Sequence, residues 1–197
     1  MALAFVPASR RAALRAAGWA LVAEDPIQTA DAIVIAVDSR ESGVLEAADL
    51  VNSGVSRTVA LFASKPDDID REFVRRGIVY EDEATRQVRL LRALGVANID
   101  LISLPIGGTE DEGRIFPAWC EARQVRSVVV VANPDHTRRL RRVLHRAMKG
   151  QATAVMVRRS RYAEFEPDRW WVTRDGARTG IVELEKLLFD VIRHPIS

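Results

Sequence analysis

The chain contains a single cysteine, Cys120, and no long apolar stretch. One cysteine excludes an internal disulfide and a metal cluster built from cysteines. Cys120 lies in a helical pattern of apolar residues, so we expect it to pack in the core rather than to react. A membrane-spanning helix needs about 18 to 20 apolar residues in a row, and no segment reaches that length. We therefore expect a cytoplasmic protein without a membrane span.

Lysine is scarce as well, with three residues against twenty-six arginines. Acidic and basic residues nearly balance, and the formal net charge is +2. The pI near 9.0 reflects only a small excess of arginine and does not by itself indicate nucleic-acid binding. The basic run at 138–146 lies partly on a predicted helix that should pack on a sheet, so we expect no nucleic-acid partner. His145 and His194 lack further ligands at metal-binding spacing, and we predict no metal site.

The pattern that dominates the chain is an alternation of short apolar runs with amphipathic segments. Buried strands are predicted at 32–37, 58–63, 99–104, 127–132 and 152–157. Helices are predicted at 9–23, 41–53, 81–94, 110–123, 137–148 and 176–193, with a short one inside 65–76. In the last helix we expect Ile181, Leu184, Leu187, Leu188 and Val191 to face inward.

This alternation predicts parallel βαβ units and hence one α/β domain. We expect a single doubly wound, Rossmann-like, three-layer domain of about five parallel strands in the order 3-2-1-4-5, with helices on both faces. Residues 1–24 form an N-terminal helix packed on or preceding the domain, and residues 25–197 form the domain itself.

The stretch from Ser127 to Arg142 predicts a strand, a sharp turn and a helix. Pro134 ends the strand, and Asp135 stands where a helix N-cap is expected. Arg138 and Arg139 then fall in the first helical turn, where the helix dipole favours anions. Two arginines at a helix end that favours negative charge suggest that an anion binds there. The alternative is that both arginines are simply exposed to solvent at the start of the helix.

Polar residues follow every predicted strand, and parallel strands end at one edge of a sheet. In doubly wound folds ligands bind beyond that edge, where the strand order reverses. We therefore predict a site for a small anionic ligand at this rim. The residues that follow the strands include Asp38, Arg40, Ser64, Gly108, Thr109, Asn133, Asp135, His136, Arg158 and Arg159.

Each candidate has a functional and a structural interpretation. His136 can act as a general base or bind phosphate, or it can be a structural imidazole. Arg139 and Arg138 offer planar forks for a phosphate or carboxylate. Gly108 and Thr109 can present donors to an anion, or form a simple turn with a threonine cap. Arg40 can reach an anion or pair with an acidic neighbour.

The pair Trp170-Trp171 can stack on a ligand ring or cover a hydrophobic edge. Ser39 or Ser64 could join His136 in a serine-type triad, but the chain has no G-x-S-x-G nucleophile elbow. We therefore reject a hydrolase of that type.

Five segments in order, ADAIVIAVDSR, the helix start at Glu83-Ala84, GGTEDEG, VVVVANPDHTRRLRRVL and TRDGARTGIVELEKLL, resemble the YdcF-like family with SanA and ElyC. The resemblance runs from about Asp25 to Val191. It implies a Rossmann-like sheet with a polar pocket at its rim. It also implies a role in envelope biogenesis or binding of a nucleotide-like ligand, with no settled reaction. The family pattern is matched by His136 and Arg139, Thr109 and Glu112, Thr173 to Gly176, Glu183, and Glu83 as the acid after the second strand.

The chain departs from the family pattern after its first two strands. Consecutive glycines often follow the first strand in the family, whereas Val37-Asp38-Ser39 stands here. Ala63-Ser64-Lys65-Pro66 replaces a Ser-Gly-Gly turn after the second. Asp38 would repel a phosphate unless it is paired, for example with Arg40.

Two hypotheses follow. In the first, the rim binds a phosphate-bearing or nucleotide-like ligand, S-adenosylmethionine among the candidates; whether a reaction follows stays open, and the sequence identifies no cofactor. In the second, the chain is a non-catalytic regulatory or structural module with a degenerate pocket, linked to envelope biogenesis. The predicted ligand contacts are Arg139, Arg138, Thr109, Gly108, Asp38, Arg40, Ser64, Glu83, Asn133 and Asp135, with His136 as the candidate catalytic residue.

Overall fold

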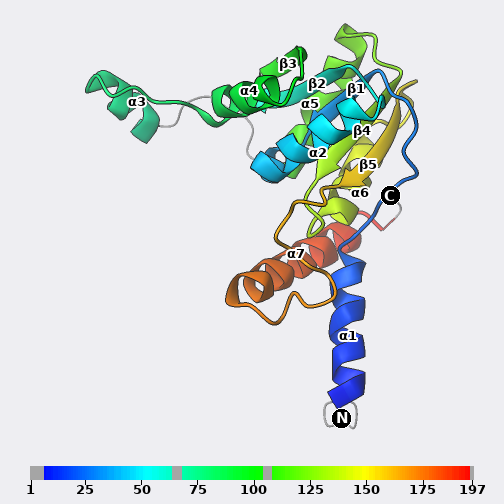
Figure 1. The fold of residues 1–197 in the computed structure, drawn as a ribbon. Helices are drawn as coiled ribbons and strands as arrows, with labels where there is room; N and C mark the ends of the chain where they lie inside the picture. Colours follow the sequence, from blue (N-terminus) through cyan, green and yellow to red (C-terminus); the bar gives the residue numbers. More distant parts are fainter. Residues whose placement is uncertain (1–6, 64–67, 104–107, 196–197) are drawn as a thin grey trace.

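The computed structural model describes residues 7–63, 68–103 and 108–195, and its centre is a five-stranded parallel sheet (Figure 1). The strand order is β3-β2-β1-β4-β5, which confirms the predicted α/β class and order. The strands are β1 (Ala32–Ile35), β2 (Thr58–Ala63), β3 (Asn98–Ser103), β4 (Ser127–Ala132) and β5 (Ala154–Arg159). The helical elements are α1 (Pro7–Ala20), η2 (Val37–Ser39), α2 (Arg40–Asn52), α3 (Asp68–Arg75), α4 (Glu83–Ala93), α5 (Thr109–Ala122), α6 (Thr137–Ala147) and α7 (Arg174–Arg193).

The two faces of the sheet are covered by different helices because successive strand residues point to opposite sides. Ile33 of β1 lies level with Val129 of β4 and packs in a core with α2 and α4. Val34 lies level with Val130 and packs in a second core with α5 and α6. Strands buried on both faces are typical of parallel sheets. This explains why continuous apolar runs such as SVVVVA predicted the strands well.

The strand order reverses between β1 and β4. From β1 the chain proceeds through β2 to β3 on one side, while β4 and β5 lie on the other side. In doubly wound sheets this is the point at which ligands bind, beyond the carboxyl ends of the strands. The predicted rim residues of β1 and β4 are therefore adjacent in space.

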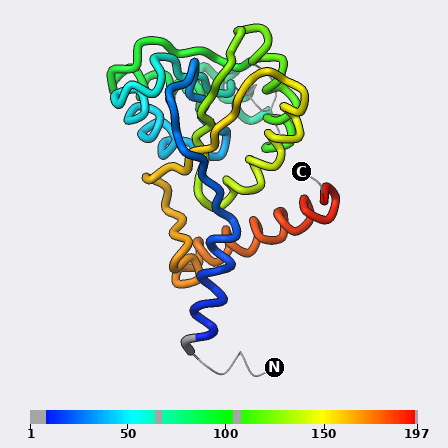
Figure 2. The backbone as a smooth tube through the Cα atoms, turned by 90° about the vertical axis from the view of Figure 1, so that its right-hand side faces the viewer, coloured from blue at the N-terminus to red at the C-terminus, as the bar shows by residue number. Residues whose placement is uncertain are grey.

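The N-terminal helix α1 packs against α7 and the segment before it, away from the two cores on the faces of the sheet (Figure 2). Leu21, Phe165, Trp170 and Leu187 form a small third core. The indole Nε1 of Trp170 donates a hydrogen bond to the carbonyl oxygen of Leu14 at 2.8 Å. Trp170 thus covers a hydrophobic edge, one of the two interpretations that the sequence left open. None of the helices within the described ranges is long and apolar enough to cross a bilayer.

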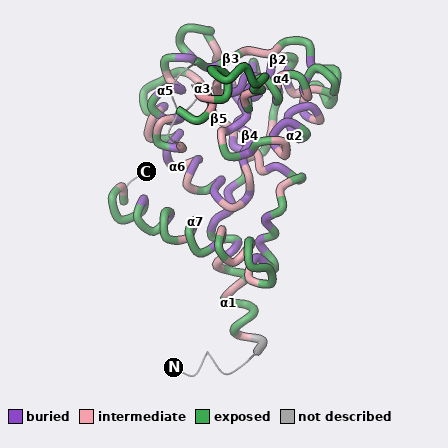
Figure 3. The backbone as a smooth tube through the Cα atoms, turned by 90° about the vertical axis from the view of Figure 1, so that its left-hand side faces the viewer, coloured by how far each residue is buried: buried purple, intermediate pink, exposed green. Residues whose placement is uncertain are grey.

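The face that helix α7 presents to the domain agrees only in part with the prediction. Leu187 is buried and Leu184 packs beside it in the third core, as expected. Ile181, Leu188 and Val191 are exposed instead of buried, and the outer side of the helix is exposed along much of its length (Figure 3). The prediction failed for these three because arginines of α6 pair with Glu183 and Asp190 and so draw the acidic side of α7 inward. The ion pairs that dock α7 are Arg139–Glu183, Arg142–Asp190 and Arg146–Asp190.

Candidate functional site

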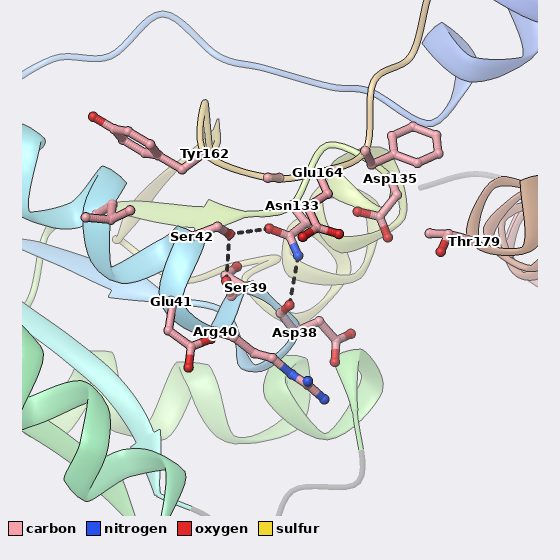
Figure 4. A pocket seen from close by; sticks show the side chains of 13 residues that line it. Asp38, Ser39, Arg40, Glu41, Ser42, Asn133, Asp135, Tyr162, Glu164 and Thr179 are labelled. Carbon is pink, nitrogen blue, oxygen red and sulfur yellow. Dashed lines mark hydrogen bonds between the residues drawn. The ribbon is translucent and has the colours of Figure 1, made fainter. Parts of the chain in front are cut away.

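The carboxyl ends of β1 and β4 are joined by a hydrogen-bond network around Asn133. The Asn133 side-chain amide donates to the carbonyl oxygen of Asp38 at 2.9 Å, and its oxygen accepts from the Ser42 hydroxyl at 2.6 Å (Figure 4). Ser39 donates its hydroxyl to the carbonyl oxygen of Val131 at 3.0 Å. These bonds fix the turn after β1 relative to β4, so Asn133 has a structural role in positioning the rim.

The backbone of Arg40 adopts a conformation that favours glycine, with φ 45° and ψ −134°. This lies near the first central position of a type II′ turn, where glycine has no steric cost. Arg40 directly follows Val37-Asp38-Ser39, the segment that departs from the consecutive glycines of the YdcF-like pattern. The strained residue lies at the mouth of the site, and such outliers gather at functional sites.

A cavity of about 680 Å³ opens at this rim. Its walls carry four carboxylates, from Asp38, Glu41, Asp135 and Glu164, and one guanidinium, from Arg40. In Figure 4, Asp38 and Asp135 lie across from Thr179 of α7. Glu41 is also paired with Arg86 of α4 at 2.8 Å, which leaves Asp38, Asp135 and Glu164 as the acidic part of the cavity. Its remaining lining residues are Ser39, Ser42, Leu45, Asn133, Tyr162, Ala163, Phe165 and Thr179.

A second cavity, of about 360 Å³, lies beside the first and shares Asp38 with it. Its walls are made by Gly108, Thr109, Glu110, Asp111, Arg139 and Lys186. Thr109 is the first residue of α5 and is only 4% exposed. Its hydroxyl oxygen has no hydrogen-bond partner among the described residues. Gly108 is the helix N-cap and has φ 134°, so the predicted threonine cap is replaced by a glycine turn.

His136 is buried directly behind Asp135, with 2% of its surface exposed. Its Nδ1 lies 3.6 Å from the Asp135 carboxylate, and its Nε2 has no partner among the described residues. Burial lowers the pKa of His136, but the close contact with the Asp135 carboxylate and the charge of Asp38 outweigh burial and raise it overall. His136 itself occupies the N-cap position of α6 without a side-chain cap bond, so the prediction of Asp135 as the cap was wrong.

Glu112 is an acid that the list of predicted ligand contacts omitted. It is 2% exposed, and its carboxylate accepts a hydrogen bond from the Val37 backbone N–H at 2.7 Å. Burial raises the pKa of Glu112, against the opposing effects of the Val37 N–H and the nearby His136. The sequence had marked Glu112 only through its match to the YdcF-like pattern, but its position three residues after Thr109, on the same helix face, could have added it to the predicted contacts.

The two arginines of the first α6 turn both have protein partners, which corrects the argument that they mark an anion. Arg138 donates from its guanidinium to the carbonyl oxygens of Ala20 and Val22, at 2.5 and 2.6 Å, and so holds the end of α1. Arg139 donates to Glu183 of α7. Arg139 still lines the smaller cavity, whereas Arg138 lines neither of the two.

Glu83, another predicted ligand contact, does not join this cluster. Glu83 is exposed at the start of α4 and accepts a hydrogen bond from Gln87 at 3.0 Å, so the predicted approach to Arg139 or Arg40 is not observed. Ser64 lies outside the described residues. Arg158 and Arg159 pair with Glu24. Cys120 is buried, and burial raises its pKa to about 11, which agrees with a packing role.

No cluster of His, Cys, Asp or Glu that could hold a metal ion occurs among the described residues. In comparisons with known proteins, the chain matches no family model, no curated protein and no solved structure. The resemblance to the YdcF-like family therefore stays a hypothesis from motifs, and the chemistry of the site must be argued from its geometry.

Proposed function

We propose that the chain is a YdcF-like protein that binds a small nucleotide-like ligand at the rim between β1 and β4. The observation that carries the proposal is the position of Asp38 between two cavities, at the point where the strand order reverses. Close to it lie two buried polar atoms, Thr109 Oγ1 and His136 Nε2, that have no partner in the described part of the chain. Leaving such an atom unpaired costs about 1 to 3 kcal/mol, so a role in binding is a reason for keeping it.

The charges favour a ligand with a positive group over one whose main feature is a phosphate. Within the described part of the chain, the Asp38 carboxylate has no hydrogen-bond or ion-pair partner, and Asp135 and Glu164 line the same cavity. Arg139, the predicted phosphate ligand, already pairs with Glu183. Of the ligands expected from the sequence, S-adenosylmethionine carries an ammonium and a sulfonium. Its adenosine can use the uncharged cavity walls, including Phe165.

His136 is the residue through which a proton would move if the bound ligand reacts. Because its pKa is raised, a larger fraction of His136 is in the imidazolium form near neutral pH than would be the case for an ordinary histidine. The neighbouring Asp135 holds Nδ1 and leaves Nε2 for another partner. The alternative, a non-catalytic module, is favoured by the protein partners that both predicted anion-binding arginines already have.

Calorimetric titration with S-adenosylmethionine, ATP and inorganic phosphate tests the proposal. We expect saturable binding of S-adenosylmethionine that Asp38→Asn weakens by about tenfold or more, because the cation loses its counter-charge. Asp175→Asn, on the exposed start of α7, serves as the matched control and should bind like the wild type. If none of the three compounds binds, or if Asp38→Asn binds as well as the control, the non-catalytic module becomes the better account.

A further inference from the structure

The smaller cavity at the rim contains two cations that share a single carboxylate. Arg139 and Lys186 both line this cavity. The guanidinium of Arg139 lies 2.9 Å from one oxygen of Glu183, and the ammonium of Lys186 lies 2.6 Å from the other. Within this group of three residues one positive charge is therefore left without a counter-charge. An anion that enters the cavity supplies that counter-charge.

The start of α5 forms part of the same wall. The first backbone N–H groups of a helix have no partner within the helix and favour an anion. Gly108 leaves open space beside them, since a Cβ at this residue would meet no atom within 4 Å. Thr109 lines the cavity too, and its buried hydroxyl has no hydrogen-bond partner among the residues described. The unpaired hydroxyl is an independent sign of a ligand, because burying such a group without a partner is unfavourable.

The acidic side chains in the first turn of α5 are each held by another group of the protein. The partners are Arg146 for Glu110 at 3.4 Å, Arg114 for Asp111 at 2.7 Å, and the Val37 backbone N–H for Glu112 at 2.7 Å. The two carboxylates that line the cavity, Glu110 and Asp111, are thus compensated by guanidinium groups. They do not cancel the surplus positive charge of the Arg139 and Lys186 pair.

Asp38 adds the opposite charge to the wall of this cavity, which it shares with the larger one. Its carbonyl oxygen accepts the hydrogen bond from Asn133, whereas its carboxylate takes part in none of the hydrogen bonds drawn in Figure 4. The smaller cavity therefore combines an unpaired carboxylate with a surplus cation. This combination suits a ligand that carries a positive and a negative group close together.

We propose that the smaller cavity holds the zwitterionic α-amino acid end of the ligand. The ammonium lies at Asp38, and the carboxylate lies at Thr109, Lys186 and the start of α5. The assignment rests on the proposed function for the rest of the ligand, since the adenosine of S-adenosylmethionine then occupies the larger cavity that Asp38 joins to the smaller one. A nucleotide phosphate provides the negative group alone and leaves Asp38 without a counter-charge.

Calorimetric titration with S-adenosylmethionine and its decarboxylated analogue tests the carboxylate subsite. We expect Thr109→Val to weaken S-adenosylmethionine by about tenfold and to leave the analogue unaffected, because the analogue lacks the carboxylate. The variant should fold, since valine keeps the shape and removes a hydroxyl that has no partner. Lys186→Gln should weaken S-adenosylmethionine by about fivefold. Lys149→Gln, at an exposed lysine that lines neither cavity, is the matched control and should bind like the wild type.

S-Adenosylhomocysteine tests the ammonium subsite, because it keeps the amino acid end and lacks the sulfonium. Asp38→Asn should weaken it as much as it weakens S-adenosylmethionine. The carboxylate subsite is overturned by a Thr109→Val variant that binds S-adenosylmethionine like the wild type, or that loses affinity for both S-adenosylmethionine and the decarboxylated analogue equally. The ammonium subsite is overturned if Asp38→Asn spares S-adenosylhomocysteine.

L-Methionine separates this inference from the proposed function, because it has the amino acid end without the adenosine. If L-methionine binds as tightly as S-adenosylmethionine and Thr109→Val weakens it, the amino acid subsite stands and the nucleotide-like ligand is withdrawn. If S-adenosylmethionine binds without any dependence on Thr109, Lys186 or Asp38, the inference fails alone. If none of these compounds binds, the inference and the proposed function fail together.

Discussion

Arg139 donates two hydrogen bonds to a single carboxylate oxygen of Glu183, from Nη2 at 2.9 Å and from Nε at 3.2 Å. The pair is mostly buried between α6 and α7, and Lys186 shares the other oxygen of Glu183. The residue that the sequence assigned to an external anion is therefore the one that neutralises an acid of the protein itself. A substitution of Arg139 should therefore lower the stability of the protein.

We expect Arg139→Ala to lower the free energy of unfolding by about 3 kcal/mol, because it leaves Glu183 buried beside Lys186 alone. The double variant Arg139→Met with Glu183→Met should recover most of that loss, since it removes both charges and keeps the volume. Urea denaturation measures both values. A single variant as stable as the wild type would show that this pair does not dock α7.

The strained backbone at Arg40 predicts that substitutions by glycine and by alanine at this position differ in stability. Arg40→Gly should raise the free energy of unfolding by about 1 kcal/mol relative to Arg40→Ala, because glycine adopts φ 45° and ψ −134° without a steric penalty. The side chain is exposed, so its removal costs both variants about the same. Denaturation of the two variants gives the difference directly, and equal stabilities would contradict the strain.

The raised pKa of His136 predicts a dependence of stability on pH. A histidine whose folded pKa exceeds its unfolded value of 6.5 stabilises the protein fully below pH 6.5, and this contribution is lost as the pH rises through the folded pKa. The melting temperature should therefore fall from pH 6 to pH 8 more steeply in the wild type than in His136→Gln. His145→Gln, at an exposed histidine of α6, is the control. Parallel slopes in all three proteins would refute the shift.

A substitution of Arg138 should destabilise the end of α1 without changing the affinity for the ligand. Its guanidinium satisfies carbonyl groups at the end of α1, and hydrogen bonds to a charged group contribute about 1.5 to 3 kcal/mol. We expect Arg138→Ala to speed hydrogen exchange at residues 14–21 by about tenfold or more. The affinity for S-adenosylmethionine should stay unchanged. A loss of affinity comparable to that of Asp38→Asn would return Arg138 to the binding site.

The sequence predicted the fold because strands and helices are encoded by patterns of residues that are close together in the chain. Strand β4 consists of the run Ser127–Ala132 that the pattern indicated, since a strand buried on both faces must be apolar throughout. The rim prediction placed Asp38 and Asn133 near each other for a similar reason, because neighbouring parallel strands end at one edge. Both deductions need only the order of the elements.

What the sequence did not predict depends on partners far away in the chain. Arg138 is held by residues 20–22, and Arg139 by Glu183, and no local pattern encodes either contact. Periodicity showed which residues of α7 share a face. It could not show that arginines of α6 would draw the acidic face inward. The hydrogen bond of Glu112 to the Val37 N–H likewise joins two residues that are far apart in the chain.

The packing of α1 bears on how the chain matures during synthesis. The groups that hold α1 come from Thr137 and Arg138 and from the region 165–187, which the ribosome produces long after α1 itself. Until residues 165–187 have emerged, Leu14 and Ala17 of α1 lack the apolar side chains against which they pack. A translation product interrupted before residue 165 should therefore expose the apolar side of α1. Proteolytic quality control can recognise such a product by the exposed apolar side of α1.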